Sequence, residues 1–580
     1  MTNATIADAF DQIADLLDFQ GANPFRVRAY RNSARTIRDY HEPLENLVVE
    51  GSKKLTQIEG IGDDLAQKIV TLVGTGELPM LMELKSQIPE SVLALLRIPG
   101  LGPKKAKALY DQLAIKTLAD LKAACDAHQV QKLKGFGAKT EQLILQGMEI
   151  AEKAGQRMLW AEADQIVQEL RKYLRSCPSI QELEFAGSYR RGRETIGDLD
   201  ILVVAQKPDE PMDCLAAFPL AAETIARGDT KMSVRTHAGL QIDLRVVPEE
   251  SFGAALQYFT GSKEHNVTMR GIAKERGLKV NEYGVFRVKG EKETYIAGRT
   301  EQEVYAALDL PLFPPEIREN RREFEWAAVG KLPELIELAD LRGDLHMHTF
   351  ETDGSASIEE MVAAARERDL KYIAITDHSK RVTMANGLNA ERLRKQWQQI
   401  DAVNKQLGKD FTLLKGIECD ILESGELDLP DDVLAEADWV VCSVHYGQKQ
   451  PREKITERIV GALANEHVDC IAHPTGRLIG RRDPYEVDIE AVFAAAKKHQ
   501  KLLELNANPL RLDLNDVMCA AAKTHGIPIV ISSDAHSTDG IDVLRYGILQ
   551  ARRAGLTKHD VANTRTWPQM KKLLPSHQHS

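Results

Sequence analysis

Seven short apolar segments in the second half of the chain constrain its fold more than any other feature. They are separated by longer stretches with helical spacing, and they span 344–348, 371–378, 412–418, 438–445, 468–473, 501–506 and 527–536. Strands that alternate with helices build a parallel sheet or a barrel, and the strand ends then meet at one edge. The sequence therefore predicts a distorted barrel of seven strands and helices, a (β/α)7 barrel, over 341–575.

Six of these seven segments end in side chains that can bind a metal. Twelve of the 16 histidines lie after residue 340, which sets this region chemically apart. One histidine at a strand end is usually structural, but six such endings indicate a metal site. Mixed imidazole and carboxylate ligands suit Mn²⁺, Zn²⁺ or Fe²⁺, and nine are too many for one ion. The candidate ligands are His346, His348, Asp353, His378, Glu418, His445, His473, Asp534 and His536.

A glycine pattern occurs three times within the first 155 residues, whose apolar spacing predicts helices throughout. Its glycines permit a tight turn whose backbone N–H groups open onto the next helix and can bind a phosphate. One copy fits any helix–helix turn, but three copies 35 to 40 residues apart indicate helix-hairpin-helix contacts to a DNA backbone. The candidate DNA-binding residues are Gly60, Gly62, Gly100, Gly102, Gly135 and Gly137, with Lys104 and Lys105.

Between these regions, two aspartates open an apolar run. Asp198 and Asp200 share one face of the expected strand, because residues two apart in a strand point the same way. By itself such a pair also fits two solvated acids at a strand end. A glycine-rich turn at 187–192 precedes them, and Asp243 in the alternating segment 241–246 adds a third carboxylate. Together these features favour a divalent metal site beside a phosphate-binding turn.

The composition argues against a membrane protein and a secreted protein. No apolar run approaches the ~18 residues of a membrane span, and the N-terminus lacks the regions of a secretion signal. Seven scattered cysteines without a Cys-x-x-Cys motif argue against a disulfide framework or a thiolate zinc site. The net charge of −11 disfavours nucleic acid as a partner, but carboxylate metal sites raise the acid count, so local patches matter more.

Four features stand together in the middle of the chain: Gly187-Ser188-x-Arg190-Arg191-Gly192, Gly197-Asp198-x-Asp200, Asp243, and Tyr258-Phe259-Thr260-Gly261-Ser262 with Asn266. With the glycine turns, they make residues 1–318 resemble a family X DNA polymerase. The resemblance implies a nucleotidyltransferase-type α+β palm and thumb, in which Asp198, Asp200 and Asp243 are catalytic and bind two Mg²⁺ (or Mn²⁺) ions. It also implies that the nucleotide is held by Gly187, Ser188, Arg191, Gly197, Tyr258, Phe259, Gly261 and Asn266.

The chain departs from that family at two positions. Lys263 stands where eukaryotic members have an acidic residue, and Gln241 stands where they often have an arginine. Neither removes a metal ligand. Lys68 matches the family's lysine nucleophile for removing 5′-deoxyribose phosphate (5′-dRP lyase), but Asp64 replaces a neighbouring lysine and opposes the lowered pKa that such a nucleophile needs. A plain phosphate contact is therefore favoured for Lys68 over the lyase role.

Three motifs mark the strand ends of the C-terminal region: His346-x-His348-Thr349, Thr376-Asp377-His378 and Ser533-Asp534-Ala535-His536. Through them, residues 341–575 resemble the polymerase-and-histidinol-phosphatase (PHP) domain. The resemblance implies three divalent ions and a phosphoesterase. In bacterial family X polymerases it implies a Mn²⁺-dependent 3′→5′ exonuclease, sometimes with cleavage at abasic (AP) sites.

These observations predict a bacterial, cytoplasmic and nucleoid-associated repair polymerase that fills short gaps and processes 3′ ends. Its expected partners are gapped or nicked DNA, deoxynucleoside triphosphates and other repair proteins, with no membrane partner, and it is expected to be a monomer. A DNA-binding scaffold with a silent polymerase site and a small-molecule phosphatase on a DNA-tethering module are the alternatives. The expected regions are 1–85 and 86–155 (helical), 156–250 (palm), 251–318 (thumb), 319–340 (linker) and 341–575 (PHP).

Overall fold

The computed structural model describes most of the chain, in two compact units. The units are residues 1–157 with 238–240, and residues 158–237 with 241–580. Within the described residues, no helix is both long enough and apolar enough to cross a membrane. Those residues are 3–39, 44, 47–48, 52–58, 60–88, 95, 101, 103–133, 135–137, 140–141, 144–145, 157–290 and 292–574.

The first unit is helical, as its apolar spacing predicted. Phe10, Ile13 and Leu17 are buried on one side of the first helix and lie in the same core as Leu109 of a later helix. Its elements are α1 (Asn3–Gln20), α2 (Pro24–Asp39), α4 (Ser52–Leu55), α5 (Asp63–Thr75), α6 (Pro79–Gln87), α7 (Pro103–Leu113), α8 (Leu118–Asp126) and the 3₁₀ turn η2 (Val130–Lys132).

Two of the glycine turns are visible in this unit. Gly60 and Gly135 have φ angles of +87° and +91°, a left-handed conformation that favours glycine. Gly62 directly precedes α5 in an extended conformation, and its carbonyl oxygen accepts the first helical hydrogen bond from Ala66. Gly137 follows the other turn and accepts in the same way from Glu141. The predicted contacts at Gly100 and Gly102, and the side chain of Lys104, lie outside the described residues.

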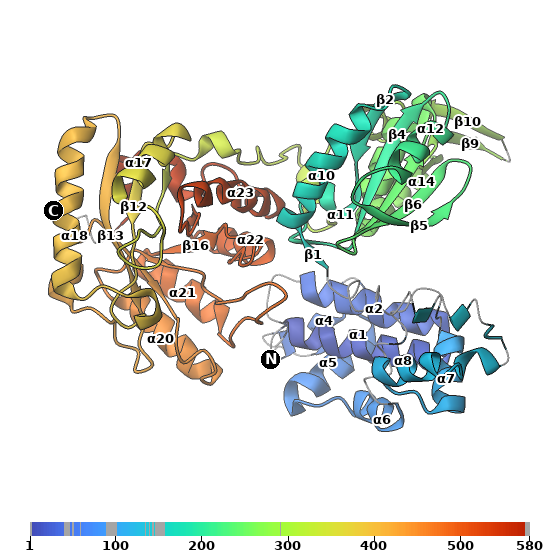
Figure 1. Ribbon diagram of the computed structural model, residues 1–580, viewed down its shortest axis with the longest axis horizontal. Helices are drawn as coiled ribbons and strands as arrows, with labels where there is room; N and C mark the ends of the chain where they lie inside the picture. Colours follow the sequence, from blue (N-terminus) through green and yellow to red (C-terminus); the bar gives the residue numbers. More distant parts are fainter. Residues whose placement is uncertain are drawn as a thin grey trace. The chain divides into compact units, whose positions relative to one another are not determined.

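The palm is a five-stranded sheet in the order β2-β4-β7-β6-β5. Helices α10 and α12 lie against it (Figure 1). The central strands β4 and β7 are parallel, and all other neighbours are antiparallel. The palm elements are β1 (Met158–Leu159), α10 (Trp160–Arg175), β2 (Ile180–Phe185), α11 (Gly187–Arg190), β3 (Thr195–Ile196), β4 (Asp198–Ala205), α12 (Asp209–Ala216), β5 (Ala221–Arg227), β6 (Lys231–Thr236) and β7 (Gln241–Val246).

The thumb combines helices with a small antiparallel sheet in the order β10-β9-β8. Its core buries Val304, Tyr305 and Phe313. The elements are η3 (Glu249–Ser251), α13 (Phe252–Thr260), α14 (Lys263–Glu275), β8 (Leu278–Asn281), β9 (Gly284–Lys289), β10 (Lys292–Ala297), α15 (Glu301–Ala306) and η4 (Pro315–Ile317), followed by α16 (Glu323–Ala328) and η5 (Leu338–Asp340).

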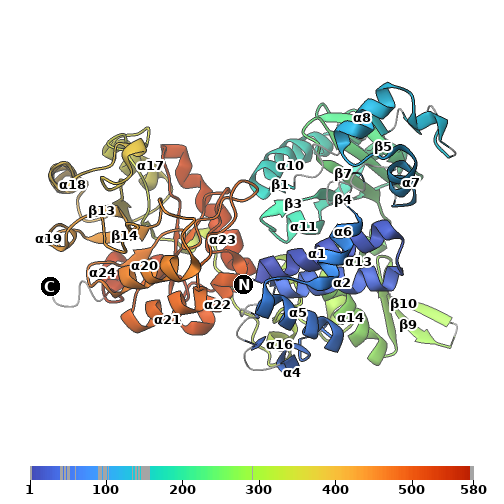
Figure 2. The ribbon, with the colours of Figure 1, turned by 90° about the horizontal axis from the view of Figure 1, so that it is seen from below.

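The seven predicted strands of the C-terminal region form one parallel sheet in sequence order. A bridge between Met347 and Ala535 joins the chain after the first and last strands, which nearly closes the barrel and confirms the predicted fold. Figures 1 and 2 show the helices surrounding the strands. The strands are β11 (Gly343–Asp344), β12 (Tyr372–Ile375), β13 (Thr412–Asp420), β14 (Trp439–Ser443), β15 (Cys470–Ile471), β16 (Leu502–Asn506) and β17 (Ile529–Ser532).

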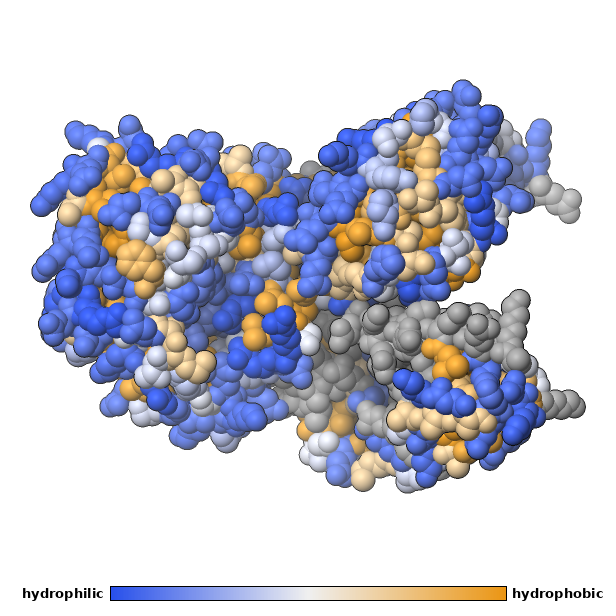
Figure 3. Space-filling model, in the orientation of Figure 1, coloured by the Kyte–Doolittle hydropathy of each residue, from blue (hydrophilic) through white to orange (hydrophobic). Residues whose placement is uncertain are grey.

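Side chains alternate between the two faces of these strands, so the barrel has two hydrophobic cores. Ile373 and Leu503 pack against the outer helices, whereas Ala374 and Leu502 face the barrel interior with Trp439. The other barrel elements are α17 (Ile358–Glu367), η6 (Thr383–Ala385), α18 (Ala390–Leu407), α19 (Asp431–Leu434), α20 (Arg452–Ala464), α21 (Ile489–His499), α22 (Asp516–His525), η7 (Thr538–Val543), α23 (Leu544–Arg553), η8 (Ala562–Thr564) and α24 (Trp567–Lys571). The visible surface is mostly hydrophilic, with separate apolar patches (Figure 3).

Two features differ from the sequence expectations. The segment 319–340, predicted as a linker, contains buried contacts that the sequence did not predict. The Glu319 side chain pairs with Arg191, that of Glu323 accepts a hydrogen bond from His265, and Ile336 joins the barrel core. Also, Cys177 and Cys214 form a disulfide that joins the connection between α10 and β2 to α12.

Candidate active sites

The palm carboxylates meet on two adjacent parallel strands. The register of β4 and β7 sets Asp200 directly opposite Asp243, and Asp198 lies two residues earlier on the same strand as Asp200. The hydroxyl of Ser233 donates a hydrogen bond to Asp243, and the amide of Gln241 lies 3.3 Å from both of its carboxylate oxygens. Gln241, which departs from the family pattern, therefore orients a predicted metal ligand.

These like charges raise the energy of the ionised site. Burial raises the pKa of Asp200 to about 7, and the carboxylates of Asp198 and Asp243 add to the rise. A divalent cation would remove this repulsion, and oxygen ligands are those that Mg²⁺ prefers. The three residues present thus fit the predicted metal.

Gly187 is pressed against the carboxylate of Asp200. Its φ angle is +64°, and a Cβ placed on it would lie 2.6 Å from Oδ2 of Asp200. A side chain at this position would displace the carboxylate. Ser188 lies in the same short helix, α11, and Gly197 lies between β3 and β4 just before Asp198.

The two arginines of the glycine turn bind the thumb. Arg190 donates to both carboxylate oxygens of Glu301 at 2.9 and 2.7 Å, and to the hydroxyl of Thr260 at 2.8 Å. Arg191 lies 3.0 Å from Glu319 and donates to the carbonyl of Thr260. The predicted role of Arg191 at a triphosphate stays a prediction; in this structure a buried glutamate pairs with it.

The predicted nucleotide-binding residues Tyr258 and Phe259 lie near the end of α13. The rings of Tyr258 and Phe259 lie 5.1 Å apart at 80°, and the guanidinium of Arg245 lies 4.4 Å from the centre of the Phe259 ring. The amide of Asn266 donates to the Tyr258 carbonyl at 2.7 Å and accepts from Gln257 at 2.6 Å. Asn266 therefore holds the helix end here, and a base contact would need these bonds to open.

Gly261 and Lys68 complete the predicted polymerase and lyase residues. Gly261 has a φ angle of +70°, and a Cβ there would lie 3.2 Å from Arg191. Lys68 on α5 forms an ion pair with Asp64, one turn earlier on the same helix. Lys105 on α7 lies 6.0 Å from the ring centre of Phe136, beside the last glycine turn.

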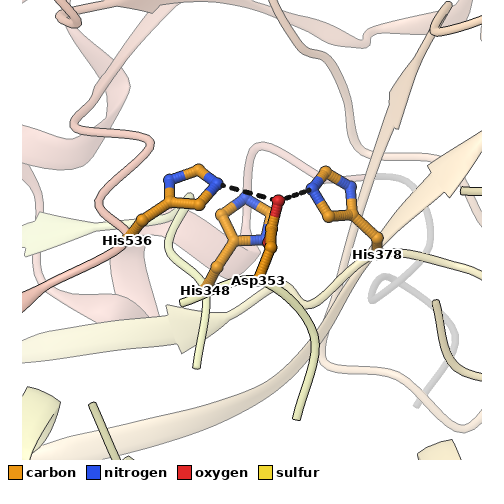
Figure 4. Close-up of side chains that lie close together, drawn as sticks. All are labelled: His348, Asp353, His378 and His536. Atoms are coloured by element: carbon orange, nitrogen blue, oxygen red, sulfur yellow. Dashed lines mark ion pairs between the residues drawn. The ribbon is translucent and has the colours of Figure 1, made fainter. Parts of the chain in front are cut away.

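All nine predicted ligands of the barrel gather at the C-terminal ends of its strands. Eight of them fall into three overlapping groups whose ligand atoms lie within 4.8 Å of one another. Asp353 lies between two imidazoles, 3.3 Å from His378 and 3.4 Å from His536 (Figure 4). The ninth, His473, lies 3.1 Å from Glu418. The groups are His348, Asp353, His378 and His536; His346, His348 and Asp534; and His378, Glu418 and His445.

Several buried ligand atoms have no hydrogen-bond partner within the described part of the chain. They include both ring nitrogens of His348 and Nε2 of His346. Buried polar atoms are almost always satisfied, so atoms aimed at one another without hydrogen bonds indicate that something else binds them. These donors fit the divalent metals that their chemistry predicts.

The imidazoles and carboxylates of the cluster also balance one another. Burial opposes the charge on His378, but Glu418 and Asp353 raise its pKa to about 10. Burial and the neighbouring His378 lower the pKa of His348 to about 3, since no carboxylate offsets them fully. The His346 pKa is raised by Glu504, Asp534 and Glu418 despite burial.

Sequence reasoning missed the residues that orient these ligands. Glu504 on β16 accepts from Nδ1 of His346 at 2.7 Å and from the backbone N–H of His473 at 2.7 Å. Asp420 accepts from the backbone N–H of His445 at 2.9 Å. Glu504 stands two residues before Asn506 at the strand end, so strand alternation places both on the interior face and could have found it.

Five segments of the chain match known protein families. Residues 1–78 match a helix-hairpin-helix domain, and 92–149 match a SAM-like helix-hairpin-helix tandem. Residues 157–238 match the DNA polymerase beta palm, 255–319 match the DNA polymerase beta thumb, and 344–508 match the PHP domain.

The chain is also similar to whole proteins. It is 41% identical over 577 residues to the DNA polymerase/3′-5′ exonuclease PolX of Bacillus subtilis (strain 168), covering 99% of each chain. It is 25% identical over 346 residues to DNA polymerase lambda of Rattus norvegicus, covering 55% of this chain and 56% of the relative. A probable phosphatase of Thermoanaerobacter sp. (strain X514) is 30% identical over 233 residues, covering 38% of this chain and 89% of the relative.

Proposed function

Because the chain belongs to the family X DNA polymerases with a C-terminal PHP domain, we propose that it fills short gaps in DNA and removes nucleotides from 3′ ends. The observation that carries the proposal is the presence, in one chain, of two separate sets of side chains that could bind divalent metals. The palm set consists of carboxylates, and the barrel set mixes imidazoles with carboxylates. The glycine turns of the helical unit would bind the DNA backbone.

At the palm, Asp198, Asp200 and Asp243 would hold two Mg²⁺ ions. When bound, these ions supply charge neutralisation of the triphosphate and activation of the primer hydroxyl. Ser233 and Gln241 fix the Asp243 carboxylate, and Gly187 leaves room beside Asp200. Tyr258 and Phe259 would pack under the deoxyribose. Thus the chain itself supplies position and charge, which are the main contributions of a protein to nucleotidyl transfer.

At the barrel, the nine ligands would hold three divalent ions, with Mn²⁺ as the proposed working metal. When bound, such ions polarise the phosphodiester and supply a nucleophile from water at neutral pH. Glu504 and Asp420 fix the ring orientations of His346 and His445. The overlap of the three groups through His348 and His378 supports more than one ion in the cluster.

Primer extension on one-nucleotide-gapped DNA with Mg²⁺ tests the polymerase. The parent should extend the primer, and Asp200→Ala should lose at least 100-fold in rate because a metal ligand is removed. Asp229→Asn, at an exposed turn of the palm, is the matched control and should extend like the parent. If the parent does not extend the primer, the polymerase proposal is wrong, and the alternative of a DNA-binding scaffold with a silent polymerase site is favoured.

Degradation of a 3′-labelled oligonucleotide with Mn²⁺ tests the exonuclease. The double variant His346→Ala/His348→Ala should lose the activity and retain gap filling. His559→Ala, an exposed histidine of the same barrel, is the control. If the double variant degrades DNA as fast as the parent, the nuclease lies elsewhere. Hydrolysis of small phosphomonoesters but not DNA would favour the small-molecule phosphatase.

We propose that Lys68 contacts phosphate and does not form a Schiff base. Its ion pair with Asp64 supports this role, because the amine is already engaged by an acid one turn away on the same helix. Borohydride treatment on an incised abasic site should therefore trap no covalent adduct. A trapped adduct that Lys68→Ala abolishes would establish a lyase instead.

The finer assignments are also proposals. The protein would act as a monomer in the bacterial cytoplasm, at the nucleoid. Its domains would be two helical regions (1–85 and 86–155), the palm (156–250), the thumb (251–318) and the PHP domain (341–575). Sedimentation at micromolar concentration checks the monomer. Metal analysis of the purified protein checks the number and identity of the ions.

A further inference from the structure

Two large apolar side chains stand exposed beside the barrel cluster. Phe350 is 58% exposed and lies two residues after the ligand His348, while Met384 is 93% exposed and lies six residues after the ligand His378. Apolar residues scattered singly over a surface need no explanation. These two occur on the loops that leave neighbouring ligand-bearing strands, so their position is tied to the site.

Hydrogen bonds hold the two loops together. The side chain of Asn386 donates to the carbonyl of Glu351 at 3.1 Å, which connects the residue after Phe350 with the turn that carries Met384. Arg392 donates to the carbonyl of Glu351 at 2.9 Å and to that of Asn386 at 2.8 Å. The backbones are therefore fixed relative to each other, while both apolar side chains face solvent.

The Phe350 loop is also anchored to the metal ligands. Asp377, next to His378, accepts from the backbone N–H of Thr349 at 2.9 Å and from its hydroxyl at 2.6 Å. Asp353 at the other end of the loop lies in one of the metal-binding groups. Hence Phe350 is carried by a short, pinned segment with cluster residues on both sides, and its position is fixed by the site.

From this arrangement, we propose that Phe350 and Met384 form a stacking surface for the 3′-terminal base of the DNA strand being degraded. A frayed 3′ nucleotide exposes the flat apolar faces of its base, and stacking on an aromatic ring accepts every base alike. The thioether of Met384 adapts to bases of different size. Lys380, an exposed residue two positions after His378, supplies a cation for the backbone. Such a contact would allow removal of each of the four nucleotides.

This inference rests on the proposed exonuclease, and the test separates the two. Full-length parent and Phe350→Ala are compared with Mn²⁺ on two single-stranded oligonucleotides, one ending in a normal nucleotide and one ending in an abasic tetrahydrofuran residue. Phe350→Ala should lower kcat/KM about 5- to 100-fold on the normal end, the range for loss of one stacked base. It should change the abasic end less than twofold.

Further variants complete the test. Phe350→Trp should restore removal of the normal end, Met384→Ala should show a smaller loss of the same kind, and Leu338→Ala, a half-exposed leucine before the barrel, should match the parent. Gap filling and bound Mn²⁺ should stay unchanged in every variant. Equal rates for Phe350→Ala and parent on the normal end would overturn the proposal. So would equal losses on both ends, since Phe350 would then support the cluster alone. A parent inactive on both ends would instead overturn the exonuclease.

Discussion

The carboxylates of the palm and the cluster of the barrel differ in how their charges are balanced. On the palm, burial and two like charges raise the pKa of Asp200 to about 7. In the barrel, burial opposes the charge on His378, but Glu418 at 2.7 Å and Asp353 together raise the pKa of that imidazole to about 10. The palm carboxylates therefore repel one another, whereas the carboxylates and imidazoles of the barrel partly offset one another's charge.

The largest expected effect tests whether the region that carries the palm site is stable independently of the barrel. Arg553 at the end of α23 is buried between Glu319 at 2.8 Å and Asp516 at 2.9 Å, and donates to the carbonyl of Arg191 at 2.6 Å. Arg553→Met should cost about 3–5 kcal/mol in unfolding free energy, because buried acids lose a partner. Thermal unfolding measures it. Arg276→Met, which removes an exposed pair with Asp309, should cost under about 1 kcal/mol.

Acid should reduce the difference in stability between the parent and Arg553→Met. Burial would raise the pKa of Glu319 and Asp516, but Arg553 is foremost among the arginines that lower it for Glu319, and Arg321 and Arg553 lower it for Asp516. Carboxyls with a depressed folded pKa contribute stability above their unfolded pKa, and that stability is lost as the pH falls below it. From pH 5 to 3 the melting temperature of the parent should thus approach that of Arg553→Met. Parallel curves would show that the acids are not coupled to Arg553.

The next prediction distinguishes the palm site from the barrel site by adding one methyl group, at Gly187. Gly187→Ala should reduce gap filling about 100-fold, because the added Cβ would lie 2.6 Å from Oδ2 of Asp200 and displace a ligand. Exonuclease activity should be unchanged. Gly271→Ala in α14 is the matched control, since nothing lies within 4 Å of its added Cβ. Loss of both activities in Gly187→Ala would mean that the palm turn also supports the barrel.

In the barrel, Glu504→Gln should weaken Mn²⁺ binding and exonuclease rate by about 10- to 100-fold, since His346 and His473 lose a charged partner that orients them. Gap filling measures the control activity and should be unaffected. Asp410→Asn, an exposed acid on the same domain, should leave both activities intact. A Glu504→Gln variant with normal metal affinity would show that the cluster orients itself without this acid.

The smallest effect concerns stability without metal. Because the folded pKa of Asp200 is raised, ionising it destabilises the metal-free fold, fully above about pH 7 and not below about pH 4. In EDTA at pH 8, Asp200→Asn should therefore gain about 1–2 kcal/mol, after allowance for solvent screening. The gain should vanish at pH 4. No gain at pH 8 would contradict the repulsion on which the comparison rests.

Much of the fold and of the candidate sites could be predicted, because strand patterns and ligand motifs can be recognised in short stretches of sequence. The ligand endings of the barrel and the alternation around Asp243 are visible within a few residues of sequence, and the structure confirms the barrel that they predicted. The partners of Arg191 and Asn266 could not be predicted. Glu319 is 128 residues from Arg191, and a buried ion pair leaves no periodic signal. The Cys177–Cys214 disulfide was missed for the same reason, since scattered spacing carries no pairing information.

The contact of Arg553 with Glu319 has a practical consequence for anyone who dissects this protein. An expression fragment that stops before the barrel would keep Glu319 and lose Arg553, Gln550 and Leu549, which contact the turn at Arg191 and Gly192. A weak polymerase fragment would then report a damaged boundary and say little about catalysis. Substituting Glu319→Gln in such a fragment, and comparing it with the unsubstituted fragment, separates these two causes.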